Sequence, residues 1–232
     1  KAEYVLSSWG KAGHLIGNHT LTHPNFNSSK ISLERMQNEL VGNDSIIRNY
    51  TGYIPLFRFP YLKGGDTEEK RDGFRTFMKK LNYREGHVTI DASDWYVNNR
   101  MTDRLKSIPG ADVEGFKQYY LAHLLEKANY YEQLSFGMTG RHIPHILLLH
   151  HNLAAGLFVD DLISHFKQNG WDVVDAGKAF SDDIYKTETT TLPAGESLIW
   201  SMAAQHEKYK SYIRYPAEDS RYEKAKMDSL GL

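Results

Sequence analysis

Short apolar runs of strand length alternate with longer amphipathic segments along this chain, and this alternation constrains the fold more than any other feature. The expected strands lie at residues 53–62, 88–90, 145–150 and 171–176. The expected helices lie at residues 32–50, 66–83, 112–136 and 160–170. A strand followed by a helix, repeated along a chain, predicts parallel β–α–β units. We therefore expect an α/β fold, built either as a barrel or as an open sheet.

Local sequence signals support these elements. Ser32 stands three residues before Arg35 at the start of one expected helix, in which Gly42 is a weak point. Asp66 or Thr67 is the N-cap candidate of the next helix, with acidic residues in its first turn and lysines in its last. The helix expected over 112–136 carries an apolar stripe of Phe116, Tyr119, Tyr120, Leu124, Ala128 and Tyr131. The runs HILLLH and WDVVDA are continuously apolar, which is typical of buried strands.

The two ends of the chain differ in character. Residues 1–13 have the apolar spacing of a helix that ends at Gly13, without an initiating Met or the features of a signal peptide. We expect the sequence to begin inside a domain. That domain, incomplete at its N-terminus, is expected to cover residues 1–184. Residues 185–232 are polar and rich in turn formers, and we expect a tail packed on the domain with one helical piece near 196–209.

Composition excludes several classes of protein. The formal net charge is −1, so no basic surface for nucleic acid or anionic membranes is indicated. No apolar run approaches the roughly 18 residues that a membrane-spanning helix needs. The chain has no cysteine, which excludes disulfides and thiolate metal ligands.

Four polar clusters are expected to lie where strands run out at their carboxyl ends, the place where α/β folds collect functional groups. They are HTLTHP at 19–24, RFPY at 58–61, DASDW at 91–95 and LLLHHN at 147–152. Because the carboxyl ends of parallel strands meet at one edge of a sheet, we expect these clusters to converge. Their convergence is a stronger signal than any single motif.

The spacing of His19 and His23 leaves their role open. In a strand, four residues would separate the two side chains by roughly 13 Å, too far for one metal ion. Pro24 disfavours an α conformation at His23. A metal-binding pair therefore requires a single helical turn or a tight loop, for which Gly17 and Asn18 supply suitable residues. The alternative is a pair of surface or capping histidines.

His150 ends an apolar run, where it either satisfies a local hydrogen bond or points into a site. Imidazole is suited to general acid catalysis because its unperturbed pKa is near 6.5. Asp91 and Asp94 are candidates for a carboxylate partner, although both could equally form turns or cap a helix. Arg58 lies between two phenylalanines, and a cation in an apolar strand usually needs a buried carboxylate partner.

Taken together, the four clusters resemble motifs of the polysaccharide deacetylases, which form carbohydrate esterase family four and carry the NodB homology domain. The resemblance covers roughly residues 1–180. It implies a distorted (β/α) barrel and a divalent metal, usually Zn²⁺, with Co²⁺ or Ni²⁺ as alternatives. It also implies hydrolysis of acetyl groups on an acetylated glycan, with N-acetyl favoured over O-acetyl, and a periplasmic or secreted protein.

The resemblance also implies roles for single residues. His19 and His23 would be metal ligands, and His150 would be the general acid, oriented by Asp94. Arg58 would pair with the catalytic aspartate, and the backbone near Tyr61 would help to hold the oxyanion. Trp95 would line the sugar site, and Leu148 would shape the acetyl pocket.

The chain departs from the family at one point. The family's first motif, Thr-Phe-Asp-Asp, supplies the catalytic base and the third metal ligand, and residues 1–18 hold nothing like it. We expect that a segment with the first barrel strands is missing, or that Asp66 substitutes as a ligand. The alternatives to a deacetylase are an inactive protein that binds sugar or metal, and a deacylase of a non-sugar amide. The sequence does not indicate the glycan or the oligomeric state.

Overall fold

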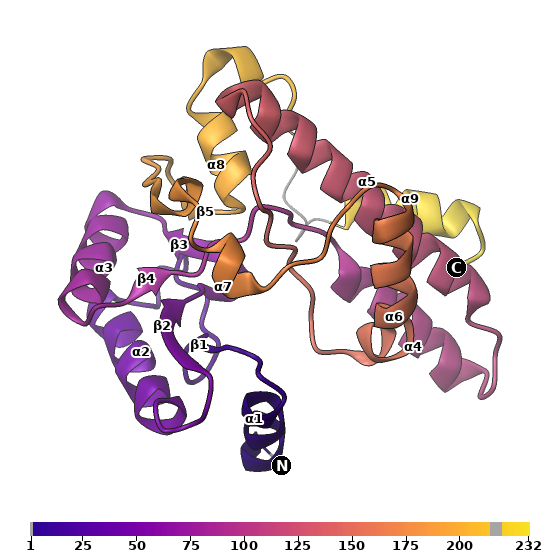
Figure 1. Ribbon diagram of the computed structural model, residues 1–232, viewed down its shortest axis with the longest axis horizontal. Coiled ribbons are helices and arrows are strands. Elements are labelled where there is room, and N and C mark those ends of the chain that lie inside the picture. The colour runs from indigo at the N-terminus through magenta and orange to yellow at the C-terminus, as the bar shows by residue number, and fades with distance from the viewer. Residues whose placement is uncertain (1, 214–219) are drawn as a thin grey trace. The chain divides into compact units, whose positions relative to one another are not determined.

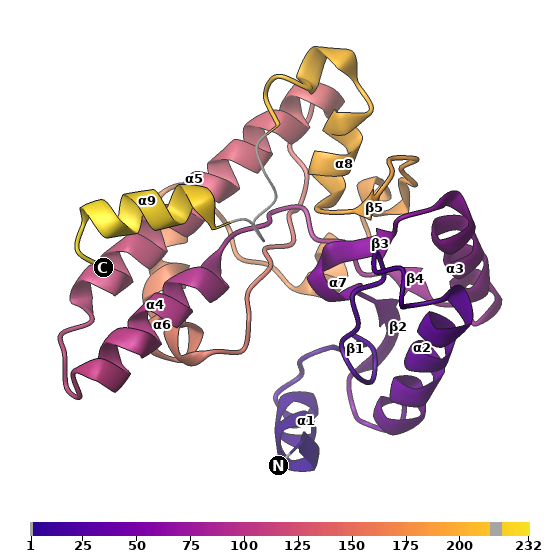
Figure 2. The ribbon, with the colours of Figure 1, turned by 180° about the vertical axis from the view of Figure 1, so that it is seen from behind.

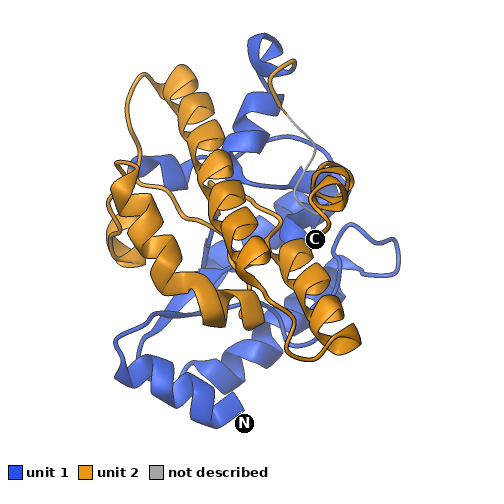
Figure 3. Cartoon of the chain, turned by 90° about the vertical axis from the view of Figure 1, so that its right-hand side faces the viewer, with its two compact units in different colours: residues 1–87, 183–210 blue, residues 88–182, 211–232 orange. Residues whose placement is uncertain are grey.

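The structure, a computed structural model, describes residues 2–213 and 220–232 (Figure 1; seen from behind in Figure 2). They form two compact units, coloured separately in Figure 3. Unit 1 comprises Lys1–His87 and Asp183–Lys210, and unit 2 comprises Val88–Asp182 and Ser211–Leu232. The C-terminal segment thus contributes to both units. The predicted domain boundary at residue 184 stays a prediction.

Unit 1 is built on a parallel sheet. Its strands are β1 (Ile16–Asn18), β2 (Tyr53–Phe57) and β4 (Arg84–Glu85), in the spatial order β1-β2-β4. Both pairings are parallel. Helix α2 (Leu33–Ile47) lies between β1 and β2 in the chain, and α3 (Glu68–Lys80) lies between β2 and β4. The predicted β–α–β units and the mixed α/β class are confirmed here, whereas the distorted barrel stays a prediction.

The helices of unit 1 begin where the sequence predicts. Ser32 Oγ accepts a hydrogen bond from Arg35 N at 3.1 Å at the start of α2, and Gly42 lies inside this helix without ending it. Thr67, rather than Asp66, caps α3, because its Oγ1 accepts from Lys70 N at 3.2 Å. The predicted N-terminal helix is α1 (Ala2–Lys11).

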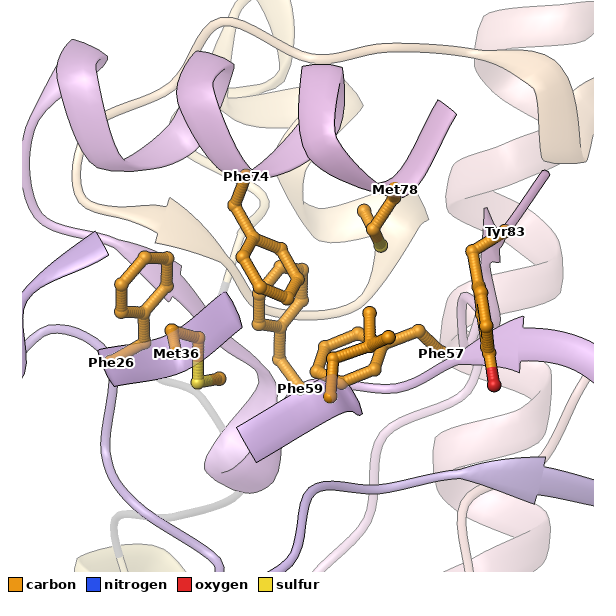
Figure 4. Packing of buried hydrophobic residues seen from close by; sticks show 8 residues of the cluster. Phe26, Met36, Phe57, Phe59, Phe74, Met78 and Tyr83 are labelled. Atoms are coloured by element: carbon orange, nitrogen blue, oxygen red, sulfur yellow. The ribbon is translucent and has the colours of Figure 1, made fainter. Parts of the chain in front are cut away.

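An aromatic cluster forms the core between the helices and the sheet of unit 1 (Figure 4). Phe74 on α3 has no exposed surface, and its ring centroid lies 5.0 Å from that of Phe57 and 5.2 Å from that of Phe59. The other members of the cluster are Phe26, Met36, Leu40, Met78 and Tyr83. Phe57, at the end of β2, and Phe59, two residues later, are thereby anchored in the core.

Part of the predicted tail joins unit 1. Strand β5 (Ala194–Gly195) pairs antiparallel with β3 (Lys63–Gly65), which follows the short helix η1 (Pro60–Leu62). A Cβ at residue 195 would lie 1.8 Å from Leu62 O, so this pairing requires glycine. The predicted helical piece is found as α8 (Leu198–Ala204) and η3 (Glu207–Tyr209), and η2 (Asp183–Lys186) precedes them.

Unit 2 is mainly helical. It contains α4 (Asp94–Ser107), α5 (Glu114–Thr139), α6 (Leu153–Gln168), α7 (Ala176–Ala179) and α9 (Arg221–Ser229). All residues of the apolar stripe predicted for the longest helix are buried in α5. Gly170, with φ of 84°, follows the end of α6 as predicted. No described helix is long and apolar enough to cross a membrane.

The strands predicted for unit 2 are the main error. Residues 88–90 and 145–150 contribute one isolated parallel bridge, between Ile90 and Leu147, and the run after His145 is half-buried rather than covered on both faces. Residues 171–175 have no regular structure, and Val173 and Val174 are 55% and 45% exposed. An apolar, β-branched run favours a strand, but only pairing with a neighbouring strand satisfies its backbone. The sequence pattern identified the apolar, β-branched runs, but it could not show whether a neighbouring strand pairs with them.

Replacement of Phe74 by Ala is expected to lower the free energy of unfolding by about 3–5 kcal/mol, because it removes a fully buried ring from a close-packed cluster. Phe77→Ala, on the same helix but only partly buried, is the matched control and should cost less than half as much. Urea unfolding followed by circular dichroism measures both. Equal losses for the two variants would contradict this description of the core.

Acid should weaken unit 1 through Asp44. Burial alone would raise the pKa of Asp44, but hydrogen bonds from Tyr83 (2.6 Å), Tyr53 (2.7 Å) and Arg48 hold it below its usual value. As the pH falls, the Asp44 carboxyl of the unfolded chain is therefore protonated at a higher pH than that of the folded chain. The stabilisation is complete above about pH 5 and is lost as the pH falls through the folded pKa. Urea unfolding at pH 7, 5 and 3 should show this loss. Asp44→Asn should be less stable than the parent at pH 7 and should lose less stability between pH 5 and 3; parallel pH curves would exclude the assignment.

Candidate functional site

The tight loop after β1, residues 19–24, which we call the histidine loop, brings His19 and His23 together. Thr20 and His23 adopt left-handed backbone conformations, with φ of 69° and 57°. The two ring centroids lie 4.9 Å apart with the planes at 75°. Of the arrangements that the sequence left open, the tight loop is the one found. The pair is compact enough for both imidazoles to reach one small ligand.

A backbone carbonyl orients the first imidazole. His19 Nδ1 lies 2.8 Å from the carbonyl oxygen of Arg58, at the end of the neighbouring strand β2. Because a carbonyl oxygen only accepts, Nδ1 carries the proton, and in the neutral imidazole Nε2 then carries the lone pair. Metal-binding histidines commonly have their second nitrogen held in this way.

Two buried polar side chains, Asn18 and Glu39, form hydrogen bonds with the backbone of the histidine loop. Asn18, 1% exposed, accepts hydrogen bonds from Thr20 N and from Asn43 Nδ2, both at 3.0 Å, and donates to Leu40 O at 2.9 Å. Glu39, 3% exposed, accepts hydrogen bonds from the backbone N–H groups of Leu21 and Thr22. Burial alone would raise the pKa of Glu39, but hydrogen bonds hold it below its usual value. Sequence reasoning missed Glu39; the available signal was a carboxylate three residues after Met36, on the apolar face of the helix.

Arg58 and Tyr61 follow β2. Arg58 Nε donates to Gly86 O at 2.9 Å, and burial lowers the pKa of Arg58 to about 10, so it stays cationic at neutral pH. Its predicted carboxylate partner is not among the described residues of unit 1. Tyr61 has φ of 55°, and its ring lies 4.7 Å from that of His23 at 73°. Unit 1 thus gathers all four residues that were predicted from its two polar clusters.

In unit 2, His150 and Asp94 form a hydrogen-bonded pair. His150 Nδ1 lies 2.7 Å from Asp94 Oδ1, and Asp94 Oδ2 accepts from His150 N at 2.9 Å and from Asn152 Nδ2 at 3.1 Å. Asp94 is fully buried at the start of α4, where the helix dipole favours a carboxylate. The His150 side chain is 49% exposed. Asp94, one of the two aspartates considered from the sequence, therefore contacts His150.

Trp95 and Leu148 lie beside this pair in the sequence. Trp95 is half-buried on α4, with its ring 5.6 Å from that of Tyr96. Leu148 is half-buried, and its N–H donates to Ile90 O at 3.0 Å. Their expected contacts with sugar and acetyl group stay predictions. Asn152, which was quoted in the motif without a role, also caps α6 by accepting from Ala155 N at 2.9 Å.

A second polar group in unit 2 was not predicted. His145 Nε2 lies 2.8 Å from Glu132, whose other oxygen lies 2.5 Å from His142 Nδ1. Burial lowers the pKa of His145, although Glu132 opposes the shift. All three line a largely apolar cavity of about 750 Å³. The lining residues support no specific ligand chemistry.

The described residues contain no group of three or more His, Cys, Asp or Glu side chains that could hold a metal ion. Asp66, considered as a substitute ligand, is paired instead with Lys70 Nζ at 2.7 Å and does not join the histidines. That alternative is therefore wrong. The two imidazoles of the histidine loop are themselves suitable zinc donors, and a zinc site normally has three or four protein ligands.

Comparison with known proteins agrees with the resemblance found in the motifs. Residues 1–85 match the family described as polysaccharide deacetylase. Over 92 residues the chain is 32% identical to a peptidoglycan-N-acetylglucosamine deacetylase of Bacillus cereus, and the alignment covers 39% of this chain and 30% of that protein. No solved structure matches the chain. The match to the polysaccharide deacetylase family thus covers the segment that contains the histidine loop, Arg58 and Tyr61.

Proposed function

We propose that this chain takes part in metal-dependent hydrolysis of N-acetyl groups on a polysaccharide or oligosaccharide. The observation that carries the proposal is the compact pair of imidazoles, with His19 oriented by a carbonyl, inside the segment that matches the family. The proposed fold of the catalytic domain is the distorted (β/α) barrel of that family. The curated relative is named for peptidoglycan, so we propose a cell-wall glycan as substrate and a location outside the cytoplasm.

His19 and His23 would hold the divalent ion, Zn²⁺ in the first instance. The donor set fits this role, since two neutral imidazoles are common zinc donors and the hydrogen bond at Nδ1 assigns Nε2 of His19 as the donor atom. When bound, the ion supplies Lewis-acid polarisation of the acetyl carbonyl. The backbone at Tyr61, held in a left-handed turn beside His23, would help to hold the carbonyl oxygen.

His150 would donate the proton that the leaving amine needs. Asp94 fixes Nδ1 as the nitrogen that faces the carboxylate, so Nε2 is the nitrogen that exchanges the proton. A buried carboxylate also stabilises the imidazolium, as it does in catalytic triads. An amine leaves poorly unless it is protonated, so this step matters more for an amide than for an ester. Arg58 would pair with the catalytic carboxylate, Trp95 would contact the sugar and Leu148 would contact the acetyl group.

His150→Ala should lower kcat for acetate release from N-acetylglucosamine oligomers by about 10²–10⁴-fold, the range typical of a general acid. The same variant should lose much less activity on p-nitrophenyl acetate, because phenolate leaves without protonation. Asp94→Asn should lower the amide rate in the same direction, because it disturbs the tautomer of His150.

His206→Ala, at an exposed histidine in unit 1, is the control and should retain the parent rates. The assignment of His150 fails if its replacement lowers the amide and ester rates equally or leaves both unchanged. Folding of each variant is checked by circular dichroism before the rates are compared.

Removal of the metal should stop the reaction. Treatment with dipicolinate should abolish acetate release, and Zn²⁺ should restore it. His19→Ala and His23→Ala should each weaken Zn²⁺ binding by more than about 100-fold, since direct ligands contribute more than the 10–100-fold of outer-shell groups. Competition with a chromophoric chelator measures the affinity; full activity after chelation would refute metal dependence.

A further inference from the structure

Glu39 places both of its oxygens under the histidine loop. Oε2 accepts hydrogen bonds from Leu21 N at 3.0 Å and from Thr22 N at 2.6 Å, and Oε1 accepts from Thr22 Oγ1 at 2.6 Å. All three bonds go to residues that lie between His19 and His23. The carboxylate therefore fixes the part of the chain that sets the separation of the two imidazoles.

The carboxylate itself is rigidly placed. It lies on the buried face of α2, and Arg35, one turn earlier, donates to Oε1 from Nε at 3.1 Å and from Nη2 at 2.9 Å. A buried carboxylate is costly unless hydrogen bonds satisfy it, and here the loop supplies most of them. The hydrogen bonds from the loop consequently stabilise the buried carboxylate of Glu39, and the carboxylate in turn gives the loop N–H groups an acceptor.

The loop conformation gives this contact its importance. Thr20 and His23 are both left-handed, which is uncommon for residues other than glycine and rare for a β-branched one. His23 N also donates to Thr20 Oγ1 at 3.0 Å. Leu21 and Thr22 are exposed to solvent, so without Glu39 water could satisfy their N–H groups and the turn would lose its restraint.

We propose that Glu39 is a positioning residue for the histidine pair: it holds His19 and His23 at the spacing that one divalent ion requires. The role rests on the proposed metal-dependent function. Glu39 acts through Leu21 and Thr22 rather than on substrate. It is thus an outer-shell residue that hydrogen-bonds the loop between the two ligands.

The first test measures Zn²⁺ affinity of the purified protein by competition with a chromophoric chelator. Glu39→Ala should weaken binding by about 10–100-fold, the effect typical of outer-shell partners. Glu39→Gln keeps one acceptor oxygen and the same shape, so it should recover most of the affinity. Glu34→Ala removes an exposed carboxylate from the same helix and should bind as the parent does.

Met78→Ala serves as a control for general destabilisation, because Met78 belongs to the buried core cluster rather than to the loop. If Met78→Ala weakens Zn²⁺ binding as much as Glu39→Ala, the effect is a loss of stability and the proposal is overturned. An affinity of Glu39→Ala within twofold of the parent, together with an unchanged histidine loop in the next test, also overturns it.

The second test needs no metal. Nitrogen-15 NMR of the imidazoles should show His19 in the single tautomer with the proton on Nδ1, as its contact with Arg58 O requires. Glu39→Ala should average this signal between tautomers, and Glu39→Gln should restore it. If His19→Ala and His23→Ala leave Zn²⁺ affinity unchanged, the proposed metal site fails, whereas the tautomer of His19 still decides whether Glu39 holds the loop.

Discussion

The register between β1 and β2 is the constraint on which the arrangement in unit 1 depends. Asn18 pairs with Phe57, so the residues that follow them, His19 and Arg58, emerge side by side from neighbouring strands. Arg58 N donates to Asn18 O at 2.9 Å, and Arg58 O receives the bond from His19 Nδ1. A shift of one residue would turn each side chain to the opposite face of the sheet and remove both contacts. Backbone pairing therefore sets the tautomer of a candidate metal ligand.

In both units a buried carboxylate accepts hydrogen bonds from a histidine of the candidate site or from the loop that carries one. Asp94 accepts two hydrogen bonds from His150 and one from Asn152, and Glu39 accepts three from the histidine loop. In each case the carboxylate lies on a helix, whose position the core of its unit fixes. A short strand end alone has too few contacts to hold an imidazole, because an exposed loop can exchange its hydrogen bonds with water. A fully hydrogen-bonded carboxylate on a packed helix supplies that restraint.

The sequence was a good guide wherever the signal was local. Ser32 and Thr67 are caps that bond to N–H groups three residues on, and the stripe on α5 follows helical spacing, so both could be predicted from nearby residues. From the residues alone, both Asp91 and Asp94 were candidates to pair with His150, and the motif resemblance selected Asp94, which lies 56 residues away in the chain. The strands expected at 145–150 and 171–176 failed because a strand depends on a partner that periodicity cannot identify. Glu39 was missed because its neighbours on α2, Met36 and Leu40, made its position look like ordinary core.

Several residues near the histidine pair of unit 1 have left-handed backbone conformations, which need surrounding contacts to hold them. Among the described residues other than glycine, positive φ values occur at Thr20, His23, Tyr61, Leu62, Asn82 and Glu196. Thr20 and His23 lie in the histidine loop, and Tyr61 and Leu62 lie in η1, where the Tyr61 ring contacts His23. Each such conformation costs on the order of 1 kcal/mol and persists only where surrounding contacts impose it. Asn18 and Glu39 impose it on the histidine loop, and the Tyr61 ring packs against His23. The left-handed conformation of the loop therefore depends on these contacts, which keep the two imidazole rings 4.9 Å apart.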